Sequence, residues 1–193
     1  MITILQNKYI TSVGNKYKDT KHIFQIIEHC CQRPFDYKKN EAPGFCLCKF
    51  KDANLGRTYD NLEKMNLDYI SLDVDDYSIE DFEKNFEKYN YILYTTSSHT
   101  PEQPRFRIII EISFPTTVTN IFDEEKNIHR KIYKETIKNA FPFADAHALD
   151  ITRFSILPLK NEHFYFKKNL GGNKFNLTNF FYAAKLKFKK EQI

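Results

Sequence analysis

Apolar residues spaced three and four apart along the chain predict four amphipathic helices. The helices are expected at residues 19–33, 79–89, about 119–139 and from about 178 onward. Pro34 follows the first of them and predicts its end, because a proline cannot continue a helix. Ser78 precedes the second helix and is expected to cap it, with Glu80 and Asp81 in the first turn, where carboxylates are favourable.

Short runs rich in β-branched and aromatic residues predict strands between these helices. The strands are expected at residues 45–50, 67–74, 91–96, 105–113 and near 154–157. After them, residues 163–168 and 174–177 flank Gly171 and Gly172, a pattern typical of a β-hairpin. Because strands alternate with helices but finish in a hairpin, the sequence predicts an α+β fold with a mixed or antiparallel sheet and flanking helices.

Length and composition suit a single globular domain: the chain has 193 residues, of which 41% are hydrophobic and 28% charged. No run approaches the roughly 20 apolar residues of a membrane span. The first residues lack the basic start and apolar run of a signal peptide. We therefore expect a cytoplasmic protein without a membrane partner. The net charge of +4 is compatible with a polyanionic partner but does not require one.

The four cysteines are Cys30, Cys31, Cys46 and Cys48. In a reducing compartment they are expected to be free thiols. A zinc site would favour two Cys-x-x-Cys knuckles, and this spacing contains neither. We therefore predict that the four cysteines act as small apolar side chains on a helix and a strand and do not form a zinc site.

The sharpest chemical signal is YISLDVDD at residues 69–76, an apolar strand that ends in Asp73 and Asp75. Side chains two apart on a strand share a face, so the two carboxylates project side by side while Val74 points into the core. Such a pair repels unless a cation lies between them, and carboxylate oxygens suit Mg²⁺ or Mn²⁺. The second interpretation is an ordinary solvated turn into a helix capped by Ser78.

A second polar segment, YTTSSHTPEQPRFRIIIEI, leads into an apolar strand. Its loop holds Ser97, Ser98 and His99, and Arg105 and Arg107 open the strand. The two arginines share a face of the strand, and their planar guanidinium groups suit phosphate oxygens. We expect the arginines to bind phosphate, and His99 to be either a donor to a phosphate or sugar or simply an exposed loop residue.

A third segment, FADAHALDITRFSILP, carries Asp145, Asp150 and Arg153 ahead of another apolar strand. Either aspartate could be a third metal ligand, and Arg153 could contact a phosphate. Alternatively, Asp150 stabilises a turn and Arg153 pairs with a carboxylate. Lys160 opens a basic stretch that extends to Lys174 and is a further candidate for nucleotide contacts.

Taken in order, these segments resemble the three motifs of the archaeo-eukaryotic primase superfamily, in its plasmid and phage replication-protein branch. The motifs are an apolar strand ending in Asp-x-Asp, a Ser-x-His type motif, and a hydrophobe-Asp motif followed by an arginine. Here they correspond to LDVD at 72–75, SSH at 97–99 and AD at 144–145, with Arg153 eight residues on. The resemblance covers about residues 67–160 within a single catalytic domain of residues 1–193.

The resemblance implies a primase-polymerase with an RRM-like core that joins nucleotides on a single-stranded DNA template lying across an open sheet face. It implies two divalent ions, Mg²⁺ or Mn²⁺, held by Asp73, Asp75 and Asp145. The incoming nucleoside triphosphate is expected to contact Ser97, His99, Arg105, Arg107, Arg153 and Lys160. No Walker A loop is present. The chain is therefore expected to be either a stand-alone domain or part of a larger replication protein that works with a helicase.

Three alternatives stay open. His99 or Arg107 could be the second-motif residue, since the family's histidine often lies on the strand where Arg107 stands. Asp150 also fits the hydrophobe-Asp pattern, although the distance to Arg153 favours Asp145. The activity could instead be that of a metal-dependent nuclease, or the chain could be a non-catalytic domain that binds single-stranded or origin DNA.

Overall fold

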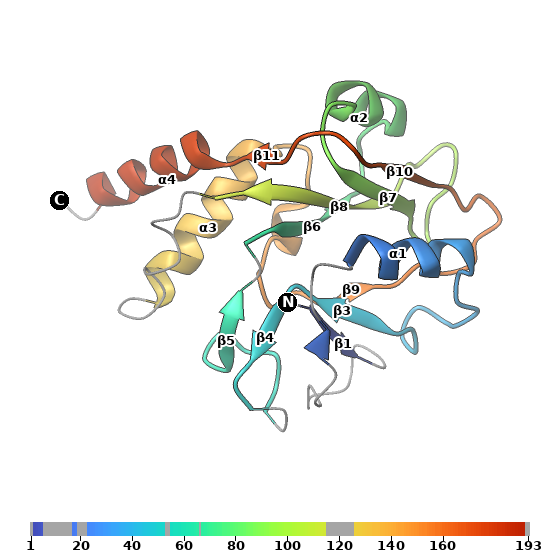
Figure 1. The fold of residues 1–193 in the computed structure, drawn as a ribbon, viewed down its shortest axis with the longest axis horizontal. Helices are drawn as coiled ribbons and strands as arrows, with labels where there is room; N and C mark the ends of the chain where they lie inside the picture. Colours follow the sequence, from blue (N-terminus) through green and yellow to red (C-terminus); the bar gives the residue numbers. More distant parts are fainter. Residues whose placement is uncertain are drawn as a thin grey trace.

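A five-stranded sheet with β8 in its middle forms the centre of the structure (Figure 1). The structure is a computed structural model that describes residues 2–5, 17–18, 23–52, 55–65, 67–114 and 126–191. The strands of this central sheet are β6 (Tyr69–Val74), β7 (Tyr91–Thr95), β8 (Phe106–Ser113), β10 (Phe166–Asn169) and β11 (Phe175–Asn176). β6 and β7 flank β8 in antiparallel orientation, β10 extends the sheet beyond β7, and β11 pairs in parallel with the far end of β8. This mixed sheet confirms the predicted α+β class.

The prediction of a β-hairpin formed by residues 163–168 and 174–177 is wrong. β10 pairs with β7 and β11 pairs with β8, so the strands on either side of Gly171 and Gly172 have different partners. Gly171 has a φ of 94°, and a Cβ added to Gly172 would lie 2.7 Å from the carbonyl oxygen of Lys88. The two glycines let the chain cross close to the backbone that precedes β7. A local sequence pattern does not distinguish such a crossing from a tight turn.

A second sheet lies beside the first and contains β2 (Tyr17–Lys18), β1 (Ile2–Leu5), β3 (Gly44–Cys46) and β9 (Ser155–Ile156), in that order. β4 (Cys48–Phe50) and β5 (Leu62–Met65) form a separate antiparallel pair. The single strand predicted at 45–50 is therefore wrong in detail, because the chain changes partners at Leu47. Alternation of side chains predicts extended backbone but does not show which strand it pairs with.

Four α-helices lie within the described ranges: α1 (Ile23–Gln32), α2 (Ile79–Phe86), α3 (Lys126–Ala140) and α4 (Thr178–Glu191). Ser78 caps α2 as predicted, and its hydroxyl accepts a hydrogen bond from the Asp81 amide at 3.2 Å. The expected first turns at 19–22 and 119–125 lie outside the described residues. None of the helices in the described part of the chain combines the length and apolar character needed to span a membrane.

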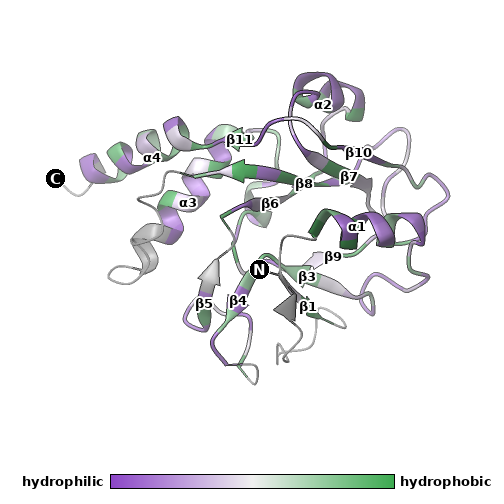
Figure 2. Cartoon of the chain, viewed as in Figure 1, coloured by the Kyte–Doolittle hydropathy of each residue, from purple (hydrophilic) through white to green (hydrophobic). Residues whose placement is uncertain are grey.

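One face of the central sheet packs against α2 and α3. Leu72, Phe106 and Ile108 from the sheet form a continuous core there with Phe82 of α2 and Phe141, which follows α3. Figure 2 shows hydrophobic colour along β8 and hydrophilic colour over α2 and much of α4. The core therefore runs through the middle of the sheet, and the polar sides of the helices face outward.

The other face of the central sheet is covered by α1, which lies between the two sheets (Figure 1). Ile23 and Ile27 of α1 pack with Ile92 and Ile109 of the central sheet and with Phe45 of β3. All five side chains are 0% exposed. The expectation of an open sheet face for a template is therefore wrong, and any ligand must bind at the ends of the strands.

The cysteines lie on α1, β3 and β4, and all four are free and buried, as predicted. Burial raises the pKa of the Cys31 thiol well above its ordinary value. Thiols that stay protonated are poor metal ligands and poor nucleophiles. Their packing therefore agrees with the structural role expected from the sequence.

Gly44 of β3 lies very close to the segment that leads into β9. A Cβ added there would lie 2.3 Å from the Phe154 ring and 2.4 Å from the Ser155 carbonyl oxygen. We predict that Gly44→Ala lowers the free energy of unfolding by about 1–3 kcal/mol through overpacking, measured by urea denaturation. Gly171→Asn is the control, since an added side chain meets open space there and asparagine tolerates positive φ. Equal losses in both variants would contradict this packing.

Candidate active site

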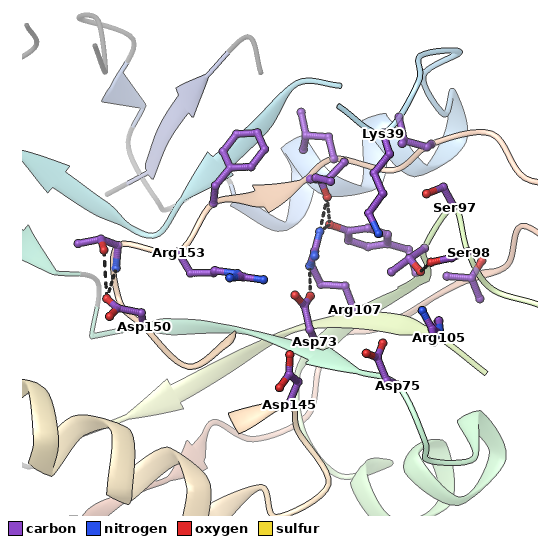
Figure 3. Close-up of a pocket in the computed structure, with 18 of the residues that line it drawn as sticks. Lys39, Asp73, Asp75, Ser97, Ser98, Arg105, Arg107, Asp145, Asp150 and Arg153 are labelled. Atoms are coloured by element: carbon purple, nitrogen blue, oxygen red, sulfur yellow. Dashed lines mark hydrogen bonds and ion pairs between the residues drawn. The ribbon is translucent and has the colours of Figure 1, made fainter. Parts of the chain in front are cut away.

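A polar pocket of about 760 Å³ opens where β6, β7 and β8 meet the segment at 150–159 (Figure 3). Its walls carry charges of both signs. The carboxylates are Asp73, Asp75, Asp145 and Asp150, and the cations are Lys39, Arg57, Arg105, Arg107 and Arg153. The three sequence motifs therefore meet in one place, together with basic residues that belong to none of them.

β6 directs the first motif toward this pocket. Its residues alternate between the core and the outside: Leu72 and Val74 are buried, while Asp73 between them is partly exposed. Asp75 follows immediately after the strand and is exposed. Both carboxylates line the pocket, in the arrangement predicted for Asp-x-Asp at a strand end.

Asp145 reaches the same pocket through a backbone contact with β6. Its amide donates a hydrogen bond to the carbonyl oxygen of Asp73, with an N···O distance of 2.8 Å. Its carboxylate accepts a hydrogen bond from the His147 amide at 2.9 Å and caps the short 3-10 helix Ala146–Ala148. This turn sets the Asp145 side chain next to Asp73 and Asp75, as Figure 3 shows.

The three carboxylates match the preference of a hard divalent cation for oxygen ligands. Neither Asp75 nor Asp145 forms an ion pair with any residue that the structure describes. As the side chains lie, however, no three potential ligands within the described ranges converge closely enough to hold an ion. The donor set therefore fits Mg²⁺ or Mn²⁺ in chemistry, and binding would require the carboxylates to draw together.

Arg107 is the immediate partner of Asp73. The two residues face each other across β6 and β8, and Arg107 also faces Tyr94 across β7. The Arg107 Nε donates to Asp73 Oδ1 at 2.5 Å. Its Nη1 donates to the carbonyl oxygen of Ile156 at 2.5 Å and lies 3.4 Å from the Tyr94 hydroxyl. The Tyr94 hydroxyl in turn donates to the same Ile156 carbonyl oxygen at 2.7 Å. This row joins the central sheet to β9 of the second sheet.

Burial and charge act in opposite directions on this row. Burial alone would raise the pKa of Asp73, but the charge and hydrogen bond of Arg107, with the charges of Arg153 and Lys39, outweigh it and lower the pKa below its ordinary value. The pKa of Arg107 is raised, because Asp73 and Tyr94 more than offset its burial. Both groups of the pair are therefore charged at neutral pH.

Further cations line the pocket from other parts of the chain. Arg153 follows a turn in which its amide donates to the carbonyl oxygen of Asp150 at 2.9 Å. The Nε of Arg105 is buried and has no hydrogen-bond partner among the residues that the structure describes. Lys39 extends into the pocket in Figure 3, and the Arg57 guanidinium lies 5.1 Å from the centroid of the Phe154 ring.

Lys39 and Arg57 were not among the residues predicted from the sequence. Both lie in polar loops far along the chain from the three motifs, and no local pattern marks them. Ser97 and Ser98, by contrast, line the pocket where they were expected.

Two predicted nucleotide contacts are not brought to the pocket. The His99 ring accepts a hydrogen bond from the Arg105 amide at 3.1 Å, and burial with the nearby charge of His163 lowers its pKa. Lys160 pairs with Asp36 at 3.0 Å and is largely exposed. Neither His99 nor Lys160 lines the pocket. The place beside the first motif is held by Arg107 instead of His99.

Asp150 has a structural environment that differs from that of Asp145. Its carboxylate pairs with Arg130 and lies 3.3 Å from Lys134, and it accepts hydrogen bonds from the Thr152 amide at 3.1 Å and hydroxyl at 3.0 Å. These contacts occupy its oxygens and hold the turn that carries Arg153. Asp145 is therefore the better candidate for a third metal ligand.

Comparison with known proteins returns no match: no protein-family model, no curated protein and no solved structure matches this chain. Function is therefore inferred from the chemistry and geometry of the pocket together with the resemblance in its motifs.

We predict that Asp150→Asn lowers the free energy of unfolding at pH 7 by about 1–3 kcal/mol, because its charged hydrogen bonds are lost. Burial would raise the pKa of Asp150, but Thr152, Arg130 and Lys134 lower it below 3.8. The stabilisation is thus present above pH 3.8 and lost as the pH falls through the lowered pKa. Urea unfolding of parent and variant from pH 7 to pH 2.5 checks this.

Asp76→Asn, an exposed carboxylate outside the pocket, is the control for the Asp150 variant and should follow the parent at every pH. A difference between parent and Asp150→Asn that persisted undiminished at pH 2.5 would show that lost packing, rather than the ionised carboxylate, is responsible.

Proposed function

We propose that this chain is a template-directed nucleotidyltransferase, a primase-polymerase of the archaeo-eukaryotic primase type whose central sheet is the RRM-like core. The observation that carries the proposal is the hydrogen bond from the Asp145 amide to the Asp73 carbonyl oxygen. It places a third carboxylate beside the Asp73–Asp75 pair, within a pocket that also holds cations. Metal-dependent phosphoryl transfer requires this combination of acidic ligands and basic phosphate contacts.

In this proposal Asp73, Asp75 and Asp145 hold two divalent ions, Mg²⁺ or Mn²⁺. When bound, the ions would supply activation of the attacking hydroxyl and neutralisation of the triphosphate charge. The protein's part is to keep three carboxylates ionised and adjacent. Arg107 contributes to this, because its charge keeps the pKa of Asp73 low in spite of burial.

The triphosphate is assigned to the cations of the pocket that are not tied to Asp73. The buried Arg105 Nε lacks an acceptor within the described part of the chain, and a phosphate oxygen would satisfy it. Arg153 and Lys39 line the same pocket, on either side of Arg107 in Figure 3. Arg107 is buried, and its Nε and Nη1 already donate to protein oxygens. Lys39 therefore takes the phosphate role that the sequence assigned to Arg107.

A single-stranded DNA template would lie along the mouth of the pocket, since both faces of the sheet are covered. Arg57 is partly exposed there, with its guanidinium over the buried Phe154 ring, so in this proposal the side of its guanidinium plane that faces away from the ring is the surface on which a base stacks. In this proposal the chain works in the cytoplasm on plasmid or phage DNA, beside a helicase that separates the strands.

A domain that binds nucleotides or DNA without catalysis is the second candidate. The Asp73–Arg107 ion pair favours it, because an arginine that neutralises Asp73 removes the need for a metal ion there. A pure binder would show no Mn²⁺-dependent rise in melting temperature, whereas a primase-polymerase would show one.

We predict that Asp75→Asn and Asp145→Asn each lower nucleotide incorporation by at least about 100-fold, because each removes a metal ligand. Incorporation is measured on single-stranded DNA with Mn²⁺, with labelled ribonucleotides and deoxynucleotides supplied separately. Asp76→Asn, a carboxylate of the same loop outside the pocket, should retain the parent rate. Incorporation at the parent rate by either pocket variant refutes the assignment, and shortening of the DNA without incorporation indicates a nuclease.

Lys39→Ala is predicted to raise the KM for the nucleotide about 5- to 20-fold with a smaller change in kcat. The reason is that a charged phosphate contact is lost both from the enzyme–nucleotide complex and from the transition state. Steady-state incorporation against nucleotide concentration gives both constants. Lys160→Ala is the matched control, since Lys160 lies outside the pocket. A larger effect from Lys160→Ala than from Lys39→Ala would reverse the two assignments.

A further inference from the structure

Arg107 has an environment unlike that of the other cations in the pocket. It is only 6% exposed, and its Nε and Nη1 both donate to protein oxygens at 2.5 Å. The Tyr94 ring also lies below the guanidinium, 5.9 Å from it. A side chain fixed by these protein contacts is poorly suited to bind and release the phosphates of a nucleotide in each reaction cycle.

A buried guanidinium requires a nearby negative charge, because an isolated charge is costly to remove from water. Asp73 is the carboxylate with which Arg107 pairs, and the side chains of the two are 7% and 20% exposed. Asp73 is also one of the three carboxylates proposed to hold the metal ions. In the proposed function, the Asp73 carboxylate therefore has two cationic partners: the Arg107 guanidinium and a divalent metal ion from solution.

We infer that Arg107 is the internal counter-ion of the metal site: it holds Asp73 in place while no metal is bound and competes with the arriving metal for that carboxylate. This inference rests on the proposed function, since it presupposes that Asp73, Asp75 and Asp145 bind a divalent ion. It assigns Arg107 a positioning role and removes it from the set of triphosphate contacts.

The geometry indicates how the two cations share Asp73. The hydrogen bond from Arg107 uses Oδ1. Asp73, Asp75 and Asp145 would hold the ion, and sharing the negative charge of Asp73 with it would weaken this bond. Arg107 would keep its other acceptor, the Ile156 carbonyl oxygen in β9. Metal binding would thus be coupled to the contact between the two sheets.

The test is the affinity for Mn²⁺, measured by calorimetry at pH 8 on parent protein, Arg107→Gln and Asp145→Asn. Glutamine removes the charge but keeps a donor for Asp73. We expect Arg107→Gln to bind Mn²⁺ about tenfold or more tightly, since a cation a few ångström away repels the ion. Its melting temperature should fall without metal and recover at saturating Mn²⁺. Arg33→Gln, an exposed arginine outside the pocket, is the matched control and should leave the affinity unchanged.

The outcomes separate this inference from the proposed function. If the parent binds Mn²⁺, Asp145→Asn does not, and Arg107→Gln binds equally or less tightly, the counter-ion role is overturned while the metal site stands. If parent and Arg107→Gln both fail to bind Mn²⁺, the metal site and the counter-ion role fall together.

A second measurement on the unchanged protein covers an Arg107→Gln variant that does not fold. The Nε–H resonance of Arg107, assigned by through-bond NMR, should shift as Mg²⁺ saturates the protein, because its bond to Asp73 weakens. A resonance that stays in place, while the amides of Asp75 and Asp145 respond to Mg²⁺, overturns the inference.

Discussion

The ion pair between Arg107 and Asp73 is the interaction on which the rest of the pocket depends. It crosses the central sheet from β8 to β6 and continues through the Ile156 carbonyl oxygen to the second sheet. One side chain thereby fixes the position of the Asp73 carboxylate and the spacing of the two sheets around the pocket. Because both charges are largely buried, Arg107 needs the carboxylate of Asp73 nearby, and Asp73 needs either Arg107 or another cation in its place. This mutual dependence makes the row sensitive to a divalent ion.

The pocket also depends on an ordinary backbone hydrogen bond. The Asp145 amide pairs with the Asp73 carbonyl oxygen, so a turn that follows α3 is attached to the end of a strand far earlier in the chain. Asp150 anchors the other end of that turn through Arg130 and Thr152. Asp145 and Arg153 are thus each held at the pocket by contacts at opposite ends of one turn.

The sequence predicted what depends on local spacing, including the Ser78 cap and the shared face of Asp73 and Asp75. It also placed Arg107 on the correct strand. It did not predict that Arg107 lies opposite Asp73, because strand register depends on the whole sheet. Lys39 and Arg57 reach the pocket from loops that carry no pattern, while His99 and Lys160 carried a motif or a charge but lie elsewhere. The motifs indicated the carboxylates together with Arg105, Arg107 and Arg153, whereas Lys39 and Arg57 were found only from three-dimensional contacts.

The central claim is that Asp73, Asp75 and Asp145 bind a shared divalent cation. The most direct measurement is anomalous diffraction from crystals of the protein soaked in Mn²⁺ with a non-hydrolysable nucleoside triphosphate. The account predicts an anomalous peak about 2.0–2.3 Å from oxygens of all three carboxylates, with the phosphates on the side of Lys39 and Arg153. Mn²⁺ and nucleotide bound only outside this pocket, with the Arg107–Asp73 pair undisturbed, would contradict it.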